Sequence, residues 1–276
     1  MYDWLVAQRA ERGHTIVALG GGVVGDLAGF VAATYLRGMP FVQAPTSFLA
    51  MVDASIGGKV AVDHREAKNL IGQFYQPWLV VSDVSALKTL PHQTLVDGCA
   101  EAIKHALILD PKLLDDMEAR ADDLLHVEPA VTVDLVRRNV AIKAAIVAED
   151  ERDTGRRAVL NYGHTIGHAI EAAAAYSITH GAADAIGMTA AAAIGLRLGV
   201  TPPRVVERQA AVLERYGLAT RGPKLDAGRV LAALALDKKI ADGSQRWVLL
   251  EDIGRAVQRD DVPVDLVRDV VREILA

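Results

Sequence analysis

The segment that most constrains the fold runs from residue 15 to residue 37, TIVALGGGVVGDLAGFVAATYLR. An apolar, β-branched run ends in three consecutive glycines, and helix-compatible residues follow at once. With two further short apolar runs, FVQAPT and WLVVSD, this order predicts parallel strands connected by helices. Glycines at such a turn let a backbone approach a pyrophosphate, although a tight structural turn favours the same residues.

After Pro91 the pattern changes to long helical periodicity. We therefore expect an α/β chain with an incomplete Rossmann-like domain over residues 1–91 and an all-α domain over residues 92–276. The first domain is expected to be incomplete because its first recognisable strand already carries the glycine turn. Helices are predicted at residues 94–109, 111–125, 130–149, 157–175, 181–198, 204–216, 226–236 and 263–275, and a strand at RWVLLEDIG.

Composition narrows the class of protein. The 276 residues carry a net charge of −5, with no Lys/Arg-rich block, which argues against a nucleic-acid surface. A single cysteine, Cys99, excludes an internal disulfide and fits a reducing compartment. The sequence contains neither an apolar run long enough for a membrane span nor a signal-peptide pattern at its start. We expect a cytoplasmic protein that binds neither nucleic acid nor membrane.

The stretch VLNYGHTIGHAIEAA, residues 159–173, carries the most distinctive polar pattern. Asn161, His164, His168 and Glu171 are spaced by three, four and three residues, so on a helix they form one stripe. Histidines four residues apart can share a metal, as in zincins, but Thr165 stands where those enzymes carry a glutamate. A lone buried histidine is usually a hydrogen-bonded core residue, whereas two on a polar stripe favour a site.

A third ligand has to come from another segment. Glu101 lies in the largely apolar helix DGCAEAIKHALI, where a carboxylate needs a cation, either Lys104 or a metal. Glu101 with two imidazoles would give the donor set of a catalytic zinc. His164 supplies one imidazole, and the residues alone do not decide whether His168 or His180 supplies the other.

The segment DASIGGKVAVDHREAKN is a candidate for binding phosphate. It places lysines on a glycine-rich loop, where ammonium groups and exposed backbone N–H groups can converge on one anion. Lysines in a loop are as often simply solvated. The residues of interest here are Asp53, Lys59, Lys68 and Asn69.

The motifs together resemble the 3-dehydroquinate synthases, within the sugar-phosphate cyclases. The resemblance runs from about residue 15 to residue 254, with the motifs in the family's order. They are ALGGGVVGDLAGFVAATYLRG, APTSFLAMVDASIGGK, KNLIGQFYQP, LKTLP, AEAIKH, EDERDTGRRAVLNYGHTIGHAIEA and HGAADAIGM.

The resemblance implies an NAD- and metal-dependent enzyme of the shikimate pathway, with zinc or cobalt as the metal and a homodimer as its assembly. It would convert 3-deoxy-D-arabino-heptulosonate 7-phosphate to 3-dehydroquinate and phosphate. The steps are transient oxidation by NAD, phosphate elimination, re-reduction and intramolecular aldol closure.

The resemblance also assigns residues. The metal ligands would be Glu101, His164 and His180, and NAD would contact Gly20, Gly21, Gly22, Asp26, Thr46, Ser47 and Lys68. The catalytic residues would be His168, Lys104, Asn161 and Asp53. Other substrate contacts would be Lys59, Asn69, Lys143 and Arg157. One of Lys238 and Lys239 would join them, with Lys239 preferred. Arg37 matches a residue that, in the family dimer, reaches the partner's phosphate site.

Three departures from the family pattern stand out. The resemblance implies a further N-terminal segment, with early strands and part of the NAD site, that we do not expect residues 1–91 to supply. Ala182 and Asp184 replace a common Glu and Val, and we hypothesise that Asp184 orients the His180 imidazole. Ser47 replaces a common threonine. The alternatives are another sugar-phosphate cyclase, a metal-dependent polyol dehydrogenase and an inactive fragment.

Overall fold

The chain divides into two compact units. The structure is a computed structural model that describes residues 1–64, 67–240 and 246–276, without the side chains of residues 67–68 and 237–240. Unit 1 comprises residues 1–98 and 127–152, and unit 2 comprises residues 99–126 and 153–276. The domain boundary expected after residue 91 stays a prediction. Among the described helices, none is both long and apolar enough to cross a membrane.

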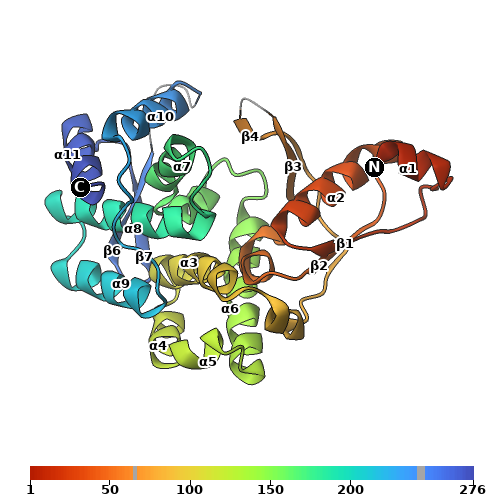
Figure 1. Ribbon diagram of the computed structural model, residues 1–276, viewed down its shortest axis with the longest axis horizontal. Helices are drawn as coiled ribbons and strands as arrows, with labels where there is room; N and C mark the ends of the chain where they lie inside the picture. The colour runs from red at the N-terminus through yellow and green to blue at the C-terminus, as the bar shows by residue number, and fades with distance from the viewer. Residues whose placement is uncertain (65–66, 241–245) are drawn as a thin grey trace. The chain divides into compact units, whose positions relative to one another are not determined.

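Unit 1 is built on a three-stranded parallel sheet with the order β1-β2-β5, of which Figure 1 labels β1 and β2. The parallel strands expected from the alternating pattern are confirmed. In register, Ile16 pairs with Phe41 and Gly20 with Pro45, so β1 and β2 end together. The elements are α1 (Tyr2–Ala7), β1 (Ile16–Gly20), α2 (Gly22–Thr34), η1 (Tyr35–Arg37), β2 (Phe41–Pro45), the π-helical turn η2 (Ala50–Ala54), β3 (Lys59–His64), β4 (Ala67–Phe74), β5 (Leu79–Val80), η3 (Val84–Thr89) and α6 (Pro129–Glu149).

A hairpin occupies the segment that the sequence suggested was a loop. Strands β3 and β4 pair antiparallel, with Lys59 opposite Phe74. Val60 of β3 is buried against α2, where a Cβ atom at Gly29 would come within 2.4 Å of its Cγ1. The missing side chain of Gly29 therefore makes room for the hairpin. Because this packing partner is distant in sequence, the local glycine-rich pattern did not reveal the strands.

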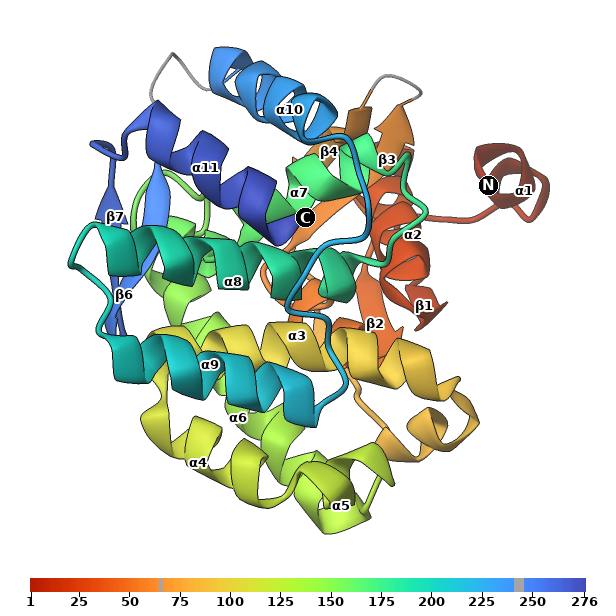
Figure 2. The same ribbon diagram turned by 60° about the vertical axis from the view of Figure 1, so that its left-hand side comes forward.

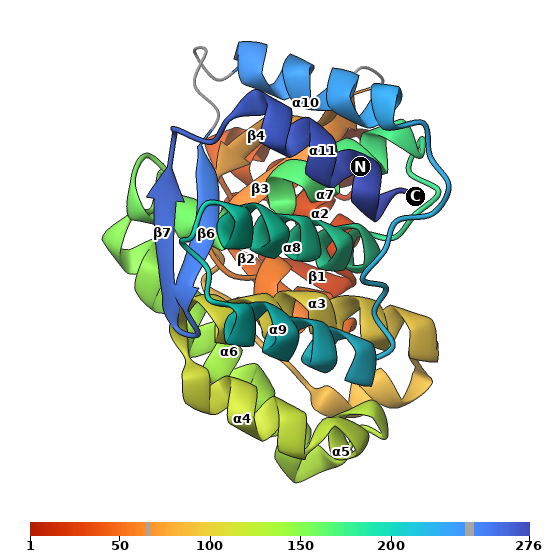
Figure 3. The same ribbon diagram turned by 90° about the vertical axis from the view of Figure 1, so that its left-hand side faces the viewer.

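Unit 2 is mainly helical, and α8 is its central helix, packed against α7, α9, α11 and β6 (Figures 2 and 3). Helix α3 (His92–Leu109) begins in unit 1 and supplies residues 99–109 to unit 2. The other elements are α4 (Pro111–Ala119), α5 (Ala121–Leu125), η4 (Arg156–Asn161), α7 (His164–Ala173), α8 (His180–Arg197), α9 (Pro203–Arg215), α10 (Ala227–Ile240), β6 (Trp247–Asp252), β7 (Arg255–Arg259) and α11 (Val264–Ile274).

Two details of unit 2 differ from the sequence-based expectation. The strand near residue 250 is one half of a β6–β7 hairpin. The helix expected over residues 157–175 is interrupted, because Gly163 adopts a φ of +83° just before α7 begins. Asn161 consequently ends the 3₁₀ turn η4 and does not continue the helical stripe of His164, His168 and Glu171.

Candidate metal centre and strand-end turns

Glycines allow α7 and α8 to pack backbone against backbone. A Cβ atom at Gly187 of α8 would lie 2.1 Å from the carbonyl oxygen of Gly163 and 2.8 Å from the amide nitrogen of Gly167. Any larger residue would push the two helices apart. The close approach brings the histidines of α7 next to the first turns of α8.

Three imidazoles gather at this crossing. The ring centroid of His164 lies 5.0 Å from that of His168 and 5.4 Å from that of His180. The rings of His168 and His180 are 5.9 Å apart. His164 and His168 are one helical turn apart, as their spacing predicted, and His180 comes from the start of α8.

Glu101 of α3 completes the cluster. Its Oε1 lies 3.2 Å from Nε2 of His164 and 3.4 Å from Nε2 of His180. Asp184, one turn beyond His180, places Oδ2 3.0 Å from the same Nε2. Ligand atoms of Glu101, His164, His180 and Asp184 all lie within 4.8 Å of one another. His168 is outside this group, so the geometry favours His180 as the ligand beside Glu101.

The donor set fits a divalent cation. Glu101 and Asp184 are each 1% exposed, and none of their four carboxylate oxygens meets the geometric criteria for a hydrogen bond within the described residues. Buried carboxylates are stable only when paired or bound to a metal. The ammonium group of Lys104 contacts Glu101 and lies 3.4 Å from Nε2 of His164. Carboxylate oxygens and imidazole nitrogens together are ligands that zinc and cobalt accept.

The electrostatics of the cluster keep its carboxylate ionised. Burial acts to raise the pKa of Glu101, but Lys104 and then His164 outweigh it and hold that pKa well below its usual range. For His180, burial acts to lower the pKa, but Asp184 raises it far above the ordinary value, with help from Glu101 and Glu171.

His168 and Glu171 complete the α7 face. Loss of surrounding water, followed by repulsion from His164, lowers the pKa of His168. Oε2 of Glu171 lies 3.4 Å from Nδ1 of His180, the ring nitrogen opposite the one that faces Glu101. Sequence reasoning gave this orienting role to Asp184, whose Oδ2 instead lies 3.0 Å from Nε2 of His180 and whose Oδ1 lies 3.5 Å from Nδ1 of His164. The sequence placed Glu171 on the stripe but assigned it no role.

The other candidate residues of unit 2 differ in exposure. Lys104 and Arg157 are buried, at 2% and 3% exposed, whereas Asn161 is exposed. The side chain of Lys239 lies outside the described residues, as does that of Lys238. Their predicted substrate contacts stay predictions.

In unit 1, two turns lie side by side at the carboxyl ends of β1 and β2. The amide of Thr46 donates a hydrogen bond of 2.9 Å to the carbonyl of Gly20. A Cβ atom at Gly21 would sit 3.4 Å from Oγ of Ser47. Ligands of parallel α/β sheets bind at this end of the strands, and the amino terminus of α2 favours an anion there. The turn containing Gly22 thus fits a cofactor pyrophosphate.

Charged residues of unit 1 form a second group. Nζ of Lys143, on α6, lies 2.8 Å from Oδ1 of Asp53 and donates to the carbonyl oxygen of Asp53 at 2.7 Å. Burial raises the pKa of Asp26 from 3.8 to about 6, against the effect of Lys143, while Asp63 and Asp53 add to the rise. The sequence did not indicate that residues 53 and 143 would meet.

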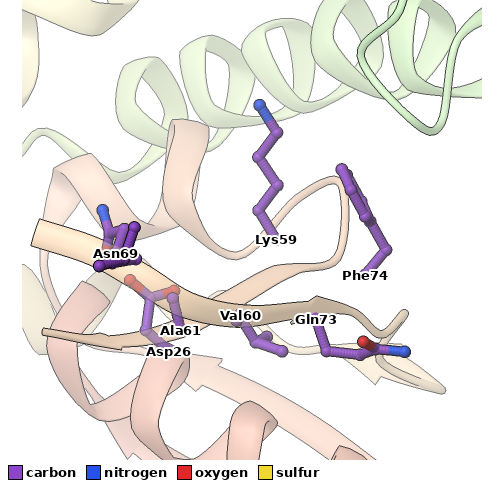
Figure 4. A pocket seen from close by; sticks show the side chains of 9 residues that line it. Asp26, Lys59, Val60, Ala61, Asn69, Gln73 and Phe74 are labelled. Atoms are coloured by element: carbon purple, nitrogen blue, oxygen red, sulfur yellow. The ribbon is translucent and has the colours of Figure 1, made fainter. Parts of the chain in front are cut away.

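A cavity of about 360 Å³ lies beside Asp26 and the β3–β4 hairpin (Figure 4). Lys59 and Asn69, both predicted to bind substrate, line it. Figure 4 shows the Lys59 side chain extending away from its strand. Arg37 is exposed in η1 and is not among the lining residues. The Lys68 side chain lies outside the described residues.

Comparison with known proteins gives consistent matches. The family described as 3-dehydroquinate synthase N-terminal matches residues 1–97, and the one described as 3-dehydroquinate synthase C-terminal matches residues 98–240. A 3-dehydroquinate synthase of Nitrosospira multiformis is 46% identical over 277 aligned residues, which cover 100% of this chain and 76% of the relative.

Two solved structures are similar to the whole chain. The 2-epi-5-epi-valiolone synthase of Streptomyces hygroscopicus subsp. jinggangensis 5008, with NAD+ and Zn2+ bound, has a TM-score of 0.92 at 30% identity, covering 99% of this chain and 77% of that one. A 2-deoxy-scyllo-inosose synthase complexed with carbaglucose-6-phosphate, NAD+ and Co2+ has a TM-score of 0.90 at 31% identity, covering 99% and 78%.

Proposed function

Because this chain belongs to the 3-dehydroquinate synthase family, we propose that it converts 3-deoxy-D-arabino-heptulosonate 7-phosphate to 3-dehydroquinate and phosphate. The reaction is a phosphate elimination in which NAD is used and regenerated within one turnover. The observation that carries the proposal is the meeting of Glu101, His164 and His180, with Glu101 Oε1 3.2 and 3.4 Å from the two imidazole nitrogens.

The metal and NAD would carry out some steps of the reaction, and the protein's side chains would carry out others. A divalent metal held by Glu101, His164 and His180 would polarise a substrate hydroxyl, and NAD would accept and return a hydride. The protein's own part is to hold the substrate and to move protons. His168 is suited to accept the hydroxyl proton at an imidazole nitrogen, because its lowered pKa keeps the ring neutral near pH 7.

Lysine and arginine side chains would bind the substrate's anionic groups. A sugar phosphate with a carboxylate brings several negative charges, which ammonium and guanidinium groups bind through charge-assisted hydrogen bonds. We assign this role to Lys59, Lys104, Lys143, Arg157 and Lys239, with hydroxyl contacts from Asn69, Asn161 and Asp53. Arg37 would act across a homodimer, which is the proposed assembly.

The cofactor would lie at the strand ends of unit 1. The glycine turn, Gly20–Gly22, would face the pyrophosphate, with Thr46 and Ser47 of the neighbouring turn beside it. Asp26 and Lys68 are the further residues assigned to NAD. Zinc or cobalt is the proposed metal and the cytoplasm the proposed location.

The test is to supply the heptulosonate phosphate with NAD and Zn2+ or Co2+, and to measure phosphate, 3-dehydroquinate and NADH together. Equal amounts of phosphate and 3-dehydroquinate without net NADH are expected. NADH released in step with substrate consumption would instead indicate a polyol dehydrogenase. No detectable NAD binding by isothermal titration at millimolar concentrations would indicate an inactive chain.

Another sugar-phosphate cyclase activity is the second candidate, since both similar solved structures are cyclases with other names. The identity is higher to the 3-dehydroquinate synthases, 46% against 30 and 31%. Parallel assays with glucose 6-phosphate and sedoheptulose 7-phosphate separate the candidates. Faster turnover of either sugar than of the heptulosonate phosphate would replace the proposed substrate.

A further inference from the structure

We propose that Asp184 is a fourth protein ligand of the metal held by Glu101, His164 and His180. The inference deepens the proposed function, on which it rests for the presence of a metal. It assigns Asp184 to direct coordination, where the sequence alone suggested that it orients a neighbouring imidazole.

The first argument is which ring nitrogen Asp184 faces. Oδ2 of Asp184 lies 3.0 Å from Nε2 of His180, and Oε1 of Glu101 lies 3.4 Å from that same Nε2. An orienting carboxylate binds the nitrogen that does not coordinate the metal. Glu171 already holds that position, with Oε2 3.4 Å from Nδ1 of His180. Through Oδ2, Asp184 therefore shares the metal-facing side of His180 with Glu101, while its Oδ1 lies 3.5 Å from Nδ1 of His164, the ring nitrogen opposite the one that faces Glu101.

The second argument is the spacing of the donor atoms. Zinc binds imidazole nitrogen and carboxylate oxygen at about 2.0–2.2 Å in a tetrahedron, so neighbouring ligand atoms lie about 3.3–3.6 Å apart. Glu101 Oε1 is 3.2 Å from His164 Nε2 and 3.4 Å from His180 Nε2. Asp184 adds a separation of 3.0 Å to His180. These three separations are close to those expected around one small cation, and ligand atoms of all four residues lie within 4.8 Å of one another.

The third argument is the burial of Asp184. The residue is 1% exposed, and neither carboxylate oxygen meets hydrogen-bond criteria within the described part of the chain. A Cβ atom at Gly167 would lie 2.5 Å from Oδ1, so this oxygen occupies space that an alanine on α7 would fill. A carboxylate buried in such a position needs positive charge beside it; the His180 imidazole faces Oδ2, and a bound divalent metal would add two positive charges.

Coordination by Asp184 has a consequence for the free protein. Two carboxylates neutralise a divalent ion, and with two imidazoles they complete a tetrahedral site. Glu101, His164, His180 and Asp184 would then hold the metal without leaving a tetrahedral position for water, and the metal would polarise a substrate oxygen only as a fifth ligand, which zinc accepts. A site of three protein ligands would keep a water in the fourth position.

The test compares Asp184→Asn and Asp184→Val with the wild type, and Glu171→Gln serves as the control for an orienting carboxylate. Zn2+ affinity is measured by competition with a chromophoric chelator, and coordination by the visible spectrum of the Co2+ protein. Loss of Asp184 should weaken Zn2+ binding by about 100-fold or more and change the Co2+ spectrum. Glu171→Gln should weaken binding by about 10-fold, as outer-shell changes do, with the spectrum retained.

A measurement on the wild type covers the case in which the Asp184 variants do not fold. Water-proton relaxation reports whether a paramagnetic Co2+ carries an exchangeable water. The inference expects little enhancement in the wild type. Strong enhancement in the wild type would overturn it, as would Asp184 variants with unchanged Zn2+ affinity and an unchanged Co2+ spectrum.

The outcomes also distinguish this inference from the proposed function. A wild-type protein that binds no Zn2+ or Co2+ contradicts both. Phosphate release from the heptulosonate phosphate by a protein whose Asp184 variants bind Zn2+ normally contradicts the inference alone. Weakened Zn2+ binding by those variants, in a protein that releases no phosphate, leaves the inference standing and refutes the function.

Discussion

The strand-end turns of unit 1 and the metal centre of unit 2 present ligand-binding groups in different ways. The turns offer backbone amides and small side chains close to one another, such as Gly21 beside Ser47. The candidate metal centre offers charged side chains from three helices, where the buried carboxylates of Glu101 and Asp184 face the Lys104 ammonium and imidazole nitrogens. We propose that the turns bind an anion and that the side chains of the metal centre reach charge balance when a divalent cation binds.

This difference predicts where single substitutions are most damaging. Backbone amides remain in place when a neighbouring side chain is changed, whereas a buried ligand cluster loses charge and geometry together. Changes in unit 2 should therefore have larger effects than changes in unit 1.

The largest effect is expected for Glu101→Gln. The substitution removes the negative charge that faces both His164 and His180 and leaves Lys104 beside a neutral amide. Loss of metal polarisation, worth several kcal/mol in the transition state, should lower kcat/KM by at least about 1,000-fold. Glu251→Gln, at an exposed ion pair with Arg255, is the control. Metal binding by the Glu101 variant at the wild-type affinity would contradict the comparison.

The next largest effect is expected for Gly187→Ala, which tests the helix crossing. The new Cβ atom would meet backbone atoms of Gly163 and Gly167, which cannot rotate away. The free energy of unfolding should fall by about 3 kcal/mol, the upper range for overpacking, and metal affinity should fall with it. Urea denaturation and a Zn2+ titration measure the two effects. Gly13→Ala is the control, because no atom lies within 4 Å of its added Cβ.

Lys143→Met tests the charged group of unit 1. The substitution removes the hydrogen bond to the Asp53 carbonyl and the ion pair to its carboxylate. Breaking a fully buried pair costs about 3–5 kcal/mol, but the Asp53 side chain is 23% exposed, so we expect about 2 kcal/mol of lost stability. Urea denaturation measures the change, with Lys88→Met at an exposed site as control. If Lys143→Met lowers the free energy of unfolding by more than Gly187→Ala does, the prediction that changes in unit 2 have the larger effects is wrong.

Local sequence signals predicted parts of both regions. The glycine turn and the four-residue spacing of His164 and His168 depend on neighbours in the chain, and the structure places them as expected. The interruption before α7 was not predicted, because the positive φ of Gly163 follows from its packing against α8. Helical periodicity alone predicts that Asn161 lies on the same helical face as His164 and His168.

Long-range contacts could not be predicted from one sequence. Asp53 and Lys143 are 90 residues apart, and nothing in either segment indicates the other. The spacing of His180 and Asp184 predicted that they lie one helical turn apart. It did not predict which ring nitrogen of His180 Asp184 would face. That choice depends on Glu171, which comes from α7 and occupies the other nitrogen.

The smallest effect is expected for Asp26→Asn, and it appears as a change in pH dependence. The pKa of Asp26 is about 6 in the folded protein against 3.8 ordinarily, chiefly because of burial. Between these two values the folded state holds the proton more tightly than the unfolded state. The contribution of Asp26 to stability is therefore full below pH 4, falls as the pH rises to about 6, and stays lost above that.

Asparagine carries no charge at any of these pH values, so the variant should lose this decline. At pH 7.5 it should be more stable than the wild type by about 1 kcal/mol, a value reduced for the partial exposure of Asp26 to solvent. Urea denaturation at pH 4, 5, 6 and 7.5 measures the profile, and Asp134→Asn, at an exposed pair with Arg137, should keep the wild-type slope. The stability of the Asp26 variant could instead decline with rising pH as steeply as that of the wild type. That result would show that the buried charge of Asp26 does not destabilise unit 1. The contrast with the carboxylates of unit 2, which require a cation, would then be wrong.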